Sequence, residues 1–231
     1  MLMPTAQSHI RQVAVFDFDG TSVDGQSGSL FTTWLLGHHI MRLPRALRLG
    51  LWGVRYKLHL PFRQSEAREL VFGALLDRSP EEIDQLMLQF HDEVMVPRYR
   101  EKAMAEVARR NVEGCVTLLV SATFQPIADA AAKDMGFDAA VATLMEKSSD
   151  GHYTGNVEGE VIAGPEKYLA ASAWCDKNLG EGCWELAYAY GDHHTDEDLL
   201  SRAREAFAVC PGPSLRAAAK QRGWQILDWD E

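Results

Sequence analysis

Short apolar runs alternate along most of the chain with stretches of helical pattern. The runs are typical of buried strands, and each ends at polar or turn-forming residues. The stretches between them have the apolar spacing of helices. The predicted strands are 13–16, 115–120, 187–190, 206–210 and 224–227, and the predicted helices are 97–110, 125–135, 165–178, 196–204 and 214–222.

This alternation predicts a doubly wound α/β fold, in which helices cover both faces of a mostly parallel, Rossmann-like sheet. Ligands of such open sheets bind at the carboxyl ends of the strands. The polar residues that follow the predicted strands should therefore meet at one edge of the sheet. A hairpin-like stretch at 148–156 is expected to connect elements of this core.

Residues 22–95 interrupt the alternation with a mostly helical pattern. We interpret them as a helical cap inserted after the first strand, so that residues 1–21 and 96–231 form the core domain. One cap helix is predicted to be amphipathic, because its apolar residues fall within one narrow face and its arginines on the other side. The apolar residues are Leu43, Leu47, Leu51, Val54 and Leu58, and the arginines are Arg45, Arg48 and Arg55.

The formal net charge of the 231 residues is −10, and their 46% hydrophobic content is ordinary for a soluble globular protein. This acidic balance argues against a nucleic-acid partner, because no excess of positive charge can displace the counterions of phosphates. The cap differs, since no acidic residue but six basic ones lie between Asp24 and Glu66. That stretch has three candidate roles: a solvated surface, attraction of an anionic substrate, and peripheral contact with anionic lipid.

The sequence predicts a cytoplasmic protein. Its N-terminal residues lack the continuous apolar segment of a signal peptide. No uncharged apolar run reaches the roughly 18 residues of a membrane span. The four cysteines form no C-x-x-C pair and are expected to be reduced thiols. No feature of the sequence predicts an oligomeric state.

Four polar sites occur in a fixed order, three of them at the ends of predicted strands and one at the start of a predicted helix. They are the segment 17–21 (Asp-Phe-Asp-Gly-Thr), Ser121, Lys167, and the segment 191–196, which begins Gly-Asp and ends in Asp196. Phosphoryl transfer to water needs an in-line nucleophile, positive charge for the phosphate oxygens and a proton for the leaving oxygen. These sites supply all three.

The residue types favour particular roles. Asp17 and Asp192 are strand-end carboxylates that suit a hard cation such as Mg²⁺, which would allow Asp17 to attack a phosphate dianion. Asp19 lies on the same side of the chain as Asp17 and is placed to act first as an acid and then as a base. Ser121, with nearby backbone N–H groups, and Lys167 would bind the phosphate.

The motifs resemble those of the haloacid-dehalogenase superfamily, in which D-x-D-G-T is followed by Ser or Thr, then Lys, then G-D-x-x-x-D. The cap after the first motif and the segment 155–160 are similar, more narrowly, to the phosphoserine-phosphatase-like branch. The resemblance implies a nucleophile, an acid/base, a Mg²⁺ site, phosphate ligands and a support for the metal. By this resemblance Asp17 is the nucleophile and Asp19 the acid/base. Asp17, Asp192 and the Asp19 backbone carbonyl would bind Mg²⁺. Ser121 and Lys167 would bind the phosphate, and Asp196 would support the metal site.

The sequence departs from the family pattern at several positions. Ala122 follows Ser121 in the phosphate-binding segment, where glycine is common, and His193 follows Asp192 beside the supporting aspartate. Gln26 stands where phosphoserine phosphatases have a glutamate for the substrate amine, and Arg68 lies near the place of their carboxylate-binding arginine. Gln26 and Arg68 are therefore candidate specificity residues.

The expected function is a Mg²⁺-dependent phosphomonoesterase that hydrolyses a small phosphorylated metabolite through a phospho-aspartyl intermediate. One alternative is a lipid-phosphate phosphatase of the phosphatidylglycerophosphate type, which the basic and apolar cap favours. Another is a non-catalytic phosphate-binding module, which the changes at Ala122 and His193 favour. A dehalogenase fits less well, because that chemistry needs neither a metal nor an acid at Asp19.

Overall fold

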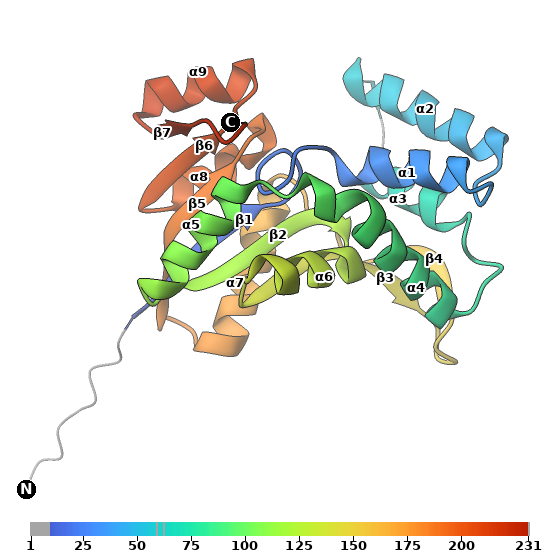
Figure 1. Cartoon of the computed structure of the whole chain (residues 1–231), viewed down its shortest axis with the longest axis horizontal. Coiled ribbons are helices and arrows are strands. Elements are labelled where there is room, and N and C mark those ends of the chain that lie inside the picture. The colour runs from blue at the N-terminus through green and yellow to red at the C-terminus, as the bar shows by residue number, and fades with distance from the viewer. Residues whose placement is uncertain (1–9, 59, 62, 231) are drawn as a thin grey trace, which may run out of the picture.

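The computed structural model describes residues 10–58, 60–61 and 63–230. Its centre is a seven-stranded sheet in the order β4-β3-β2-β1-β5-β6-β7 (Figure 1), parallel except for the pair β3 and β4. The mostly parallel α/β sheet that the sequence predicts is therefore confirmed. The strands are β1 (Arg11–Asp17), β2 (Val116–Phe124), β3 (Ala139–Lys147), β4 (Tyr153–Glu158), β5 (Trp184–Gly191), β6 (Glu205–Val209) and β7 (Gln225–Leu227).

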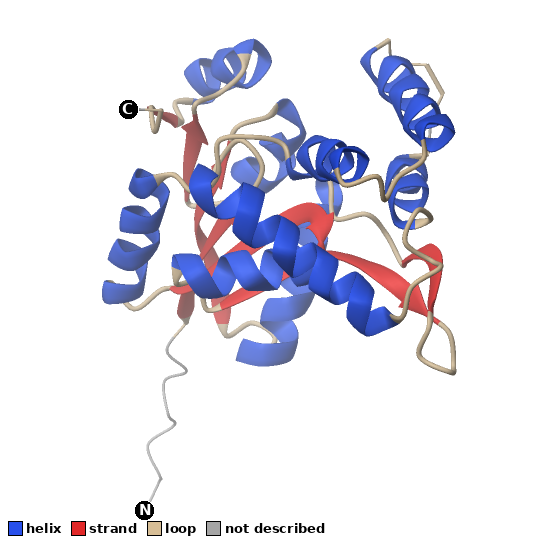
Figure 2. Cartoon of the chain, turned by 45° about the vertical axis from the view of Figure 1, so that its right-hand side comes forward, coloured by secondary structure: helices blue, strands red, loops and turns tan. Residues whose placement is uncertain are grey.

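Helices cover both faces of the sheet (Figure 2). Helices α5 and α6 pack in one hydrophobic cluster with the sheet, and α7, α8 and α9 pack in the other. The helices are α1 (Ser27–Gly37), α2 (Leu43–Lys57), α3 (Gln64–Phe72), α4 (Pro80–Phe90), α5 (Glu101–Val112), α6 (Gln125–Met135), α7 (Pro165–Leu179), α8 (Glu197–Arg202) and α9 (Pro213–Arg222), with short turns η1 (His91–Met95), η2 (Val96–Arg98) and η3 (His194–Asp196).

Strand β1 lies in the middle of the sheet, between β2 and β5. Val13 and Val15 belong to the cluster with α7, α8 and α9, whereas Ala14 and Phe16 belong to the cluster with α5 and α6. Successive side chains of a strand point to opposite faces, so a continuous apolar run is what a strand buried on both faces requires. The strand ends at Asp17, which therefore reaches the carboxyl edge at the centre of the sheet.

Proline and glycine fix the ends of the core helices close to the predicted positions. Pro126, Pro165 and Pro213 occupy the first turns of α6, α7 and α9, where a missing N–H costs nothing. Gly136 and Gly223 end α6 and α9 in the left-handed conformation that glycine adopts without steric cost.

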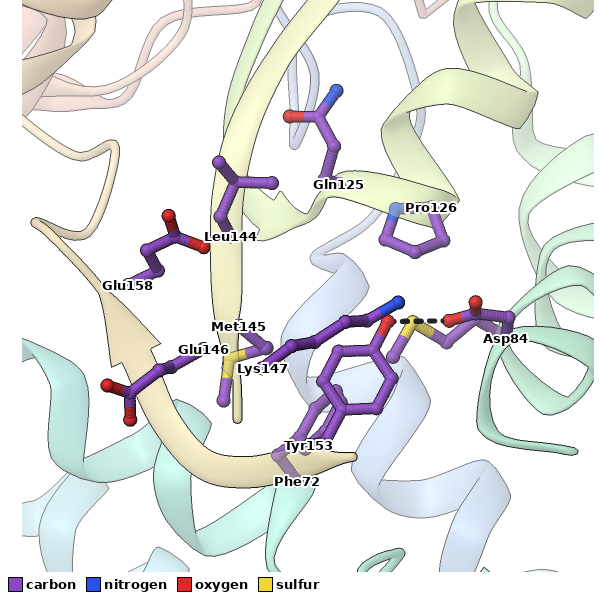
Figure 3. Close-up of a pocket in the computed structure, with 11 residues that line it drawn as sticks. Phe72, Asp84, Gln125, Pro126, Leu144, Met145, Glu146, Lys147, Tyr153 and Glu158 are labelled. Atoms are coloured by element: carbon purple, nitrogen blue, oxygen red, sulfur yellow. Dashed lines mark hydrogen bonds between the residues drawn. The ribbon is translucent and has the colours of Figure 1, made fainter. Parts of the chain in front are cut away.

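Strand β3 was not predicted from the sequence. Its run begins with alanines and includes Thr143 and Glu146, so neither a continuous apolar pattern nor a strong β preference marks it. The stretch at 148–156 does connect two core strands, because it contains the turn between β3 and β4. The hydroxyl of Tyr153 donates to Oδ1 of Asp84 at 2.7 Å, beside a cavity of about 570 Å³ between this hairpin, α4 and α6 (Figure 3).

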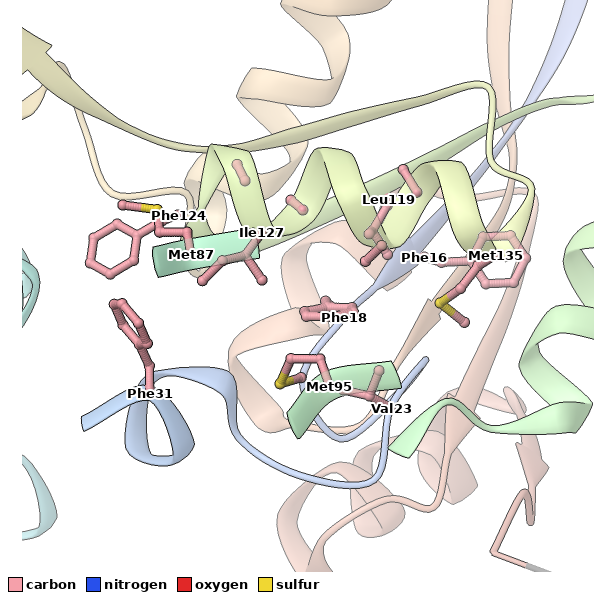
Figure 4. Packing of buried hydrophobic residues seen from close by; sticks show 14 of the residues in the cluster. Phe16, Phe18, Val23, Phe31, Met87, Met95, Leu119, Phe124, Ile127 and Met135 are labelled. Atoms are coloured by element: carbon pink, nitrogen blue, oxygen red, sulfur yellow. The ribbon is translucent and has the colours of Figure 1, made fainter. Parts of the chain in front are cut away.

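Helices α1 to α4 lie within the stretch 22–95, and their treatment as a separate cap domain stays a prediction. They pack on the main core (Figure 4): Phe31 of α1 and Met87 of α4 lie close to Phe124 and Ile127, and Phe72 of α3 belongs to the same cluster. The ring centroids of Phe31 and Phe124 are 6.0 Å apart. Helix α2 lies outside α1, on the side away from the sheet (Figure 1).

Two further expectations concern the described residues. All four cysteines are unpaired, as the absence of a C-x-x-C motif indicates. Within the described ranges, no helix combines the length and the apolar character needed to cross a bilayer.

Candidate active site

The predicted site residues meet at the carboxyl edge of the sheet, around a cavity of about 950 Å³. Asp17 ends β1, Ser121 lies in β2, Asp192 follows β5, and Lys167 is in the first turn of α7. The predicted residues that line the cavity are Asp17, Asp19, Gln26, Arg68, Ser121, Ala122, Lys167, Asp192 and His193. Asp196 is fully buried and contacts Lys167.

Lys167 joins two aspartates at the base of this cavity. Its Nζ atom lies 2.6 Å from Oδ1 of Asp17 and 2.6 Å from Oδ1 of Asp196. All three side chains are at most 7% exposed. Burial alone would lower the pKa of Lys167, but the two carboxylates outweigh burial and raise that pKa. Lys167 is therefore a permanent cation of the site.

Asp192 completes a cluster of carboxylates. Ligand atoms of Asp17, Asp192 and Asp196 lie within 4.8 Å of one another. Burial, together with the charge of Asp196, raises the pKa of Asp192 to about 6. Burial also raises the pKa of Asp17, against the opposing charge of Lys167.

This donor set fits a hard divalent cation. Three carboxylates share one ammonium, which leaves an excess of negative charge in a buried place. Carboxylate oxygens are the ligands that Mg²⁺ prefers, and a bound cation would offset the cost of burying them. Neither His193 nor His194 belongs to this cluster among the described residues, so the site lacks the imidazole ligands typical of zinc.

Two glycines allow the carboxylates to approach the backbone. A Cβ atom on Gly20 would lie 2.2 Å from Oδ2 of Asp192, and one on Gly191 would lie 2.7 Å from the Cβ of Asp196. Gly20 also has a φ of +80°, in the left-handed region. The glycines of both motifs are therefore required by close packing at the site.

Asp19 is held by a residue that the sequence analysis did not single out. Its Oδ1 accepts a hydrogen bond from the backbone N–H of Ser27 at 2.7 Å, and its Oδ2 accepts one from the Ser27 hydroxyl at 2.8 Å. Burial raises the pKa of Asp19, while the two bonds from Ser27 oppose that rise. Ser27 is the first residue of α1. A predicted start of α1 beside the D-x-D motif would have been the signal for it.

Ser121, Ala122 and Arg68 form the neighbouring wall. Ser121 is 1% exposed, and its Oγ accepts a hydrogen bond from the backbone N–H of Thr123 at 3.1 Å. Nε of Arg68 donates to the backbone carbonyl of Ala122 at 2.9 Å. Burial lowers the pKa of Arg68, and the charge of Asp19 opposes that effect. Arg68 thus brings a cation from α3 to the carboxyl edge of the sheet.

His193 supports the cluster through its backbone. Its N–H donates to Oδ2 of Asp196 at 3.1 Å, and its ring Nδ1 lies 3.1 Å from the hydroxyl oxygen of Thr195. Burial, and then the neighbouring His194, lower the pKa of the His193 ring. The imidazole is therefore favoured in its neutral form beside the cavity.

The wall of the cavity that the helices α1, α2 and α3 provide is largely apolar. The described residues of this wall include no carboxylate, and its polar side chains are Gln26, Ser27, Ser29, Thr32, Thr33 and Arg68. The apolar side chains on it are Phe31, Leu36, Ala46, Leu49, Trp52, Ala67 and Val71.

Comparison with known proteins identifies a matching family model and similar phosphatases. The model of the haloacid dehalogenase-like hydrolases matches residues 14–201. Phosphoserine phosphatase SerB1 of Mycobacterium tuberculosis is 28% identical over 94% of this chain and 70% of its own length. The histidinol-phosphatase of Neisseria meningitidis serogroup C is 29% identical over 95% of this chain and 100% of its own.

Solved structures share the fold. A protein of unknown function from Bordetella pertussis Tohama I superposes with a TM-score of 0.85 at 28% identity, over 95% of this chain and 99% of that one. A substrate-bound phosphoserine phosphatase superposes with a TM-score of 0.60 at 19% identity, over 94% and 92%. Because the family model covers the D-x-D-G-T motif, Ser121, Lys167 and the G-D-x-x-x-D motif, the chain belongs to the haloacid dehalogenase-like hydrolases, in their phosphoserine-phosphatase-like branch.

Proposed function

We propose that this chain is a Mg²⁺-dependent phosphomonoesterase that passes the phosphoryl group through Asp17. The observation that carries the proposal is the placement of Asp17 among Lys167, Asp192 and Asp196 at the base of a cavity. A nucleophilic carboxylate beside a fixed cation and a site for a second cation is what attack on a phosphate dianion requires. The branch to which the chain belongs includes proteins named as phosphatases.

In the first half of the reaction, an Oδ atom of Asp17 forms a bond to phosphorus as the ester P–O bond breaks. Asp19 gives its proton to the leaving oxygen, and the pKa of Asp19, raised by burial, favours the protonated state that this step needs. Lys167 and Ser121 bind the non-bridging oxygens. In the second half, Asp19 takes a proton from water, which attacks phosphorus and releases Asp17.

Asp17, Asp192 and the Asp19 backbone carbonyl would hold Mg²⁺, and Asp196 would orient Lys167 and this shell. When bound, the ion neutralises charge on the phosphate and on the crowded carboxylates. Ser27 would keep Asp19 aimed at the leaving oxygen, because it bonds both oxygens of that carboxylate.

The test is Mg²⁺-dependent hydrolysis of p-nitrophenyl phosphate by the full chain, with loss of activity in EDTA. Acid-quenched protein should carry an acid-stable, base-labile phosphoryl group on Asp17. The matched variant Asp17→Asn, with its folding checked by circular dichroism, should neither turn over nor become labelled. Full activity of Asp17→Asn would refute the assignment.

A lipid-phosphate phosphatase is the second candidate, and the apolar cavity wall favours it. The cavity of about 950 Å³ is larger than a phosphorylated amino acid would fill, and its helical wall offers apolar side chains rather than a carboxylate for a substrate amine. Turnover of phosphoserine, histidinol phosphate, sugar phosphates and phosphatidylglycerophosphate should be compared. A kcat/KM at least about tenfold higher for the lipid than for the polar esters would select this candidate.

A further inference from the structure

The outer face of α2 carries an apolar row that is exposed among the residues the structure describes. Four apolar residues recur at helical spacing along α2, and Leu58 continues the row one residue beyond its end. Leu43, Leu47, Leu51, Val54 and Leu58 are 66%, 66%, 61%, 52% and 62% exposed. Single exposed leucines are normal on protein surfaces, but a continuous row of this kind marks a contact surface.

The opposite face of α2 is already used by the fold. Ala46 and Leu49 pack against the main hydrophobic core, and Gly50 and Gly53 line the active-site cavity. The indole N–H of Trp52 donates to the backbone carbonyl of Arg63 at 3.0 Å. The leucine row therefore lies at the surface because the helix is fixed by its other side. The expected solvated basic face is present, but the apolar face is solvated as well.

One arginine of α2 lies beside this row, whereas Arg45, two residues before Leu47, lies about 160° round the helix from it. Arg42, Arg45 and Arg48 are exposed, and none of the three has an ion-pair partner within the described part of the chain. Arg48 follows Leu47 by one residue, which places it about 100° further round the helix, beside the row. Arg55 differs, because it lies 3.8 Å from Glu66.

The charge of this face is the reverse of the charge of the whole chain. The formal net charge is −10, yet no acidic residue lies between Asp24 and Glu66. An anionic surface would therefore repel most of the molecule and attract this face. An apolar row on a helix with basic residues is typical of segments that lie in the interface of an anionic bilayer.

We infer that the outer face of α2 docks on an anionic lipid bilayer. The leucine row enters the boundary between headgroups and acyl chains, and Arg48, beside the row, contacts lipid phosphates. This interaction goes beyond the proposed catalysis and does not depend on it. Because the inner side of α2 walls the active-site cavity, docking would bring that wall to the membrane surface.

The test is co-sedimentation of the full chain with vesicles of phosphatidylcholine, with and without about 30% phosphatidylglycerol. Binding is expected only with the anionic lipid at about 0.05 M salt, and it should fall at about 0.5 M because salt screens the arginines. Failure to bind the anionic vesicles at low salt would overturn the inference.

Two pairs of variants separate this face from the rest of the surface. The double variant Leu47→Glu/Leu51→Glu should bind at least about tenfold more weakly, whereas Leu88→Glu/Val112→Glu, which adds the same charge on α4 and α5, should retain wild-type binding. Arg45→Gln/Arg48→Gln should bind more weakly than Arg216→Gln/Lys220→Gln on α9. The inference would be overturned if, in either pair, the α2 variant and its control lost vesicle binding to the same extent.

Two readouts keep the result distinct from other causes. Hydrolysis of p-nitrophenyl phosphate in solution should be unchanged in all four variants, since none of these residues is placed in the catalytic machinery. Asp17→Asn tests only the proposed function. Its phosphatase activity can be lost while its binding to vesicles is retained. If sedimentation instead showed a wild-type dimer that Leu47→Glu/Leu51→Glu makes monomeric, with no vesicle binding, the face would pair with a second copy and the inference would fail.

Discussion

The ammonium of Lys167 lies 2.6 Å from the carboxylate of Asp17, so the residue that we propose as the nucleophile is ion-paired in this structure. The same ammonium contacts Asp196 at the same distance. Lys167 thus has two consequences: it presents positive charge where phosphate oxygens would lie, and it holds two buried carboxylates together. The first consequence can be measured as activity and the second as stability.

Replacement of Lys167 by methionine should remove activity and also destabilise the fold. Loss of one partner from a buried ion pair costs about 3 kcal/mol, because the remaining charges are left unpaired. Since burial already raises the pKa of Asp17, protonation relieves the cost at low pH, and the loss should grow as the pH rises toward about 8. Urea unfolding in EDTA measures it.

Lys133→Met is the control for this variant, because Lys133 is exposed on α6. Its free energy of unfolding should stay within about 0.5 kcal/mol of wild type. Addition of Mg²⁺ should restore part of the stability that Lys167→Met loses. Equal stability of the two variants in EDTA would show that Lys167 does not carry this ion-pair network.

Ser27→Ala tests the positioning of Asp19. The hydroxyl of Ser27 stabilises the ionised form of Asp19, so its removal should raise the pKa of Asp19 further. An acid with a higher pKa stays protonated to higher pH, and the alkaline limb of the kcat/KM profile for an alkyl phosphate should therefore move upward. Ser29→Ala, two residues along α1, should leave the profile unchanged. A uniform loss of rate without a shift would indicate a structural role only.

Most of the core could be predicted because its patterns are local. A buried central strand requires a continuous apolar run, and the segment ending at Asp17 has one. Strand β3 has no such signal, because alanines and polar residues occupy it and its place depends on pairing with β2. The exposure of the α2 leucines was also beyond the sequence, since periodicity identifies a face but not the direction in which it points.

The candidate site likewise contains residues that the sequence predicts and residues that it does not. Asp17, Asp19, Lys167 and Asp192 lie at or next to element ends, and the rule for parallel sheets brings such ends to one edge. Ser121 lies at the same edge, but β2 continues past the predicted end at residue 120 to Phe124. Ser27 has no comparable signal, because its contact with Asp19 depends on where α1 begins after an irregular turn. The long-range bond from Arg68 to the carbonyl of Ala122 likewise depends on how α3 packs over the sheet.

Protons should compete with the metal. Burial and the charge of Asp196 raise the pKa of Asp192 to about 6, and a metal ligand must be ionised. At a pH one unit below this value most of the carboxylate is protonated, so the affinity for Mg²⁺ should fall about tenfold between pH 7.5 and about pH 5. Isothermal titration calorimetry at the two pH values measures the change. An affinity that is the same at both would contradict the role of Asp192 as a ligand.

Gly20→Ala should disable the metal site through one methyl group. The added Cβ would lie 2.2 Å from Oδ2 of Asp192, so that carboxylate must move away from Asp17. The φ of +80° adds backbone strain of about 1 kcal/mol. Gly114→Ala is a matched control, because Gly114 has a φ of +82° but no atom within 4 Å of its added Cβ. Gly20→Ala should lose more stability in EDTA than Gly114→Ala, since both variants bear the strain but only Gly20→Ala must also displace a carboxylate. Only Gly20→Ala should lose Mg²⁺ binding and phosphatase activity, because only there does the methyl group displace a carboxylate. Equal Mg²⁺ affinity in the two variants would mean that Asp192 does not need its observed position to bind the ion.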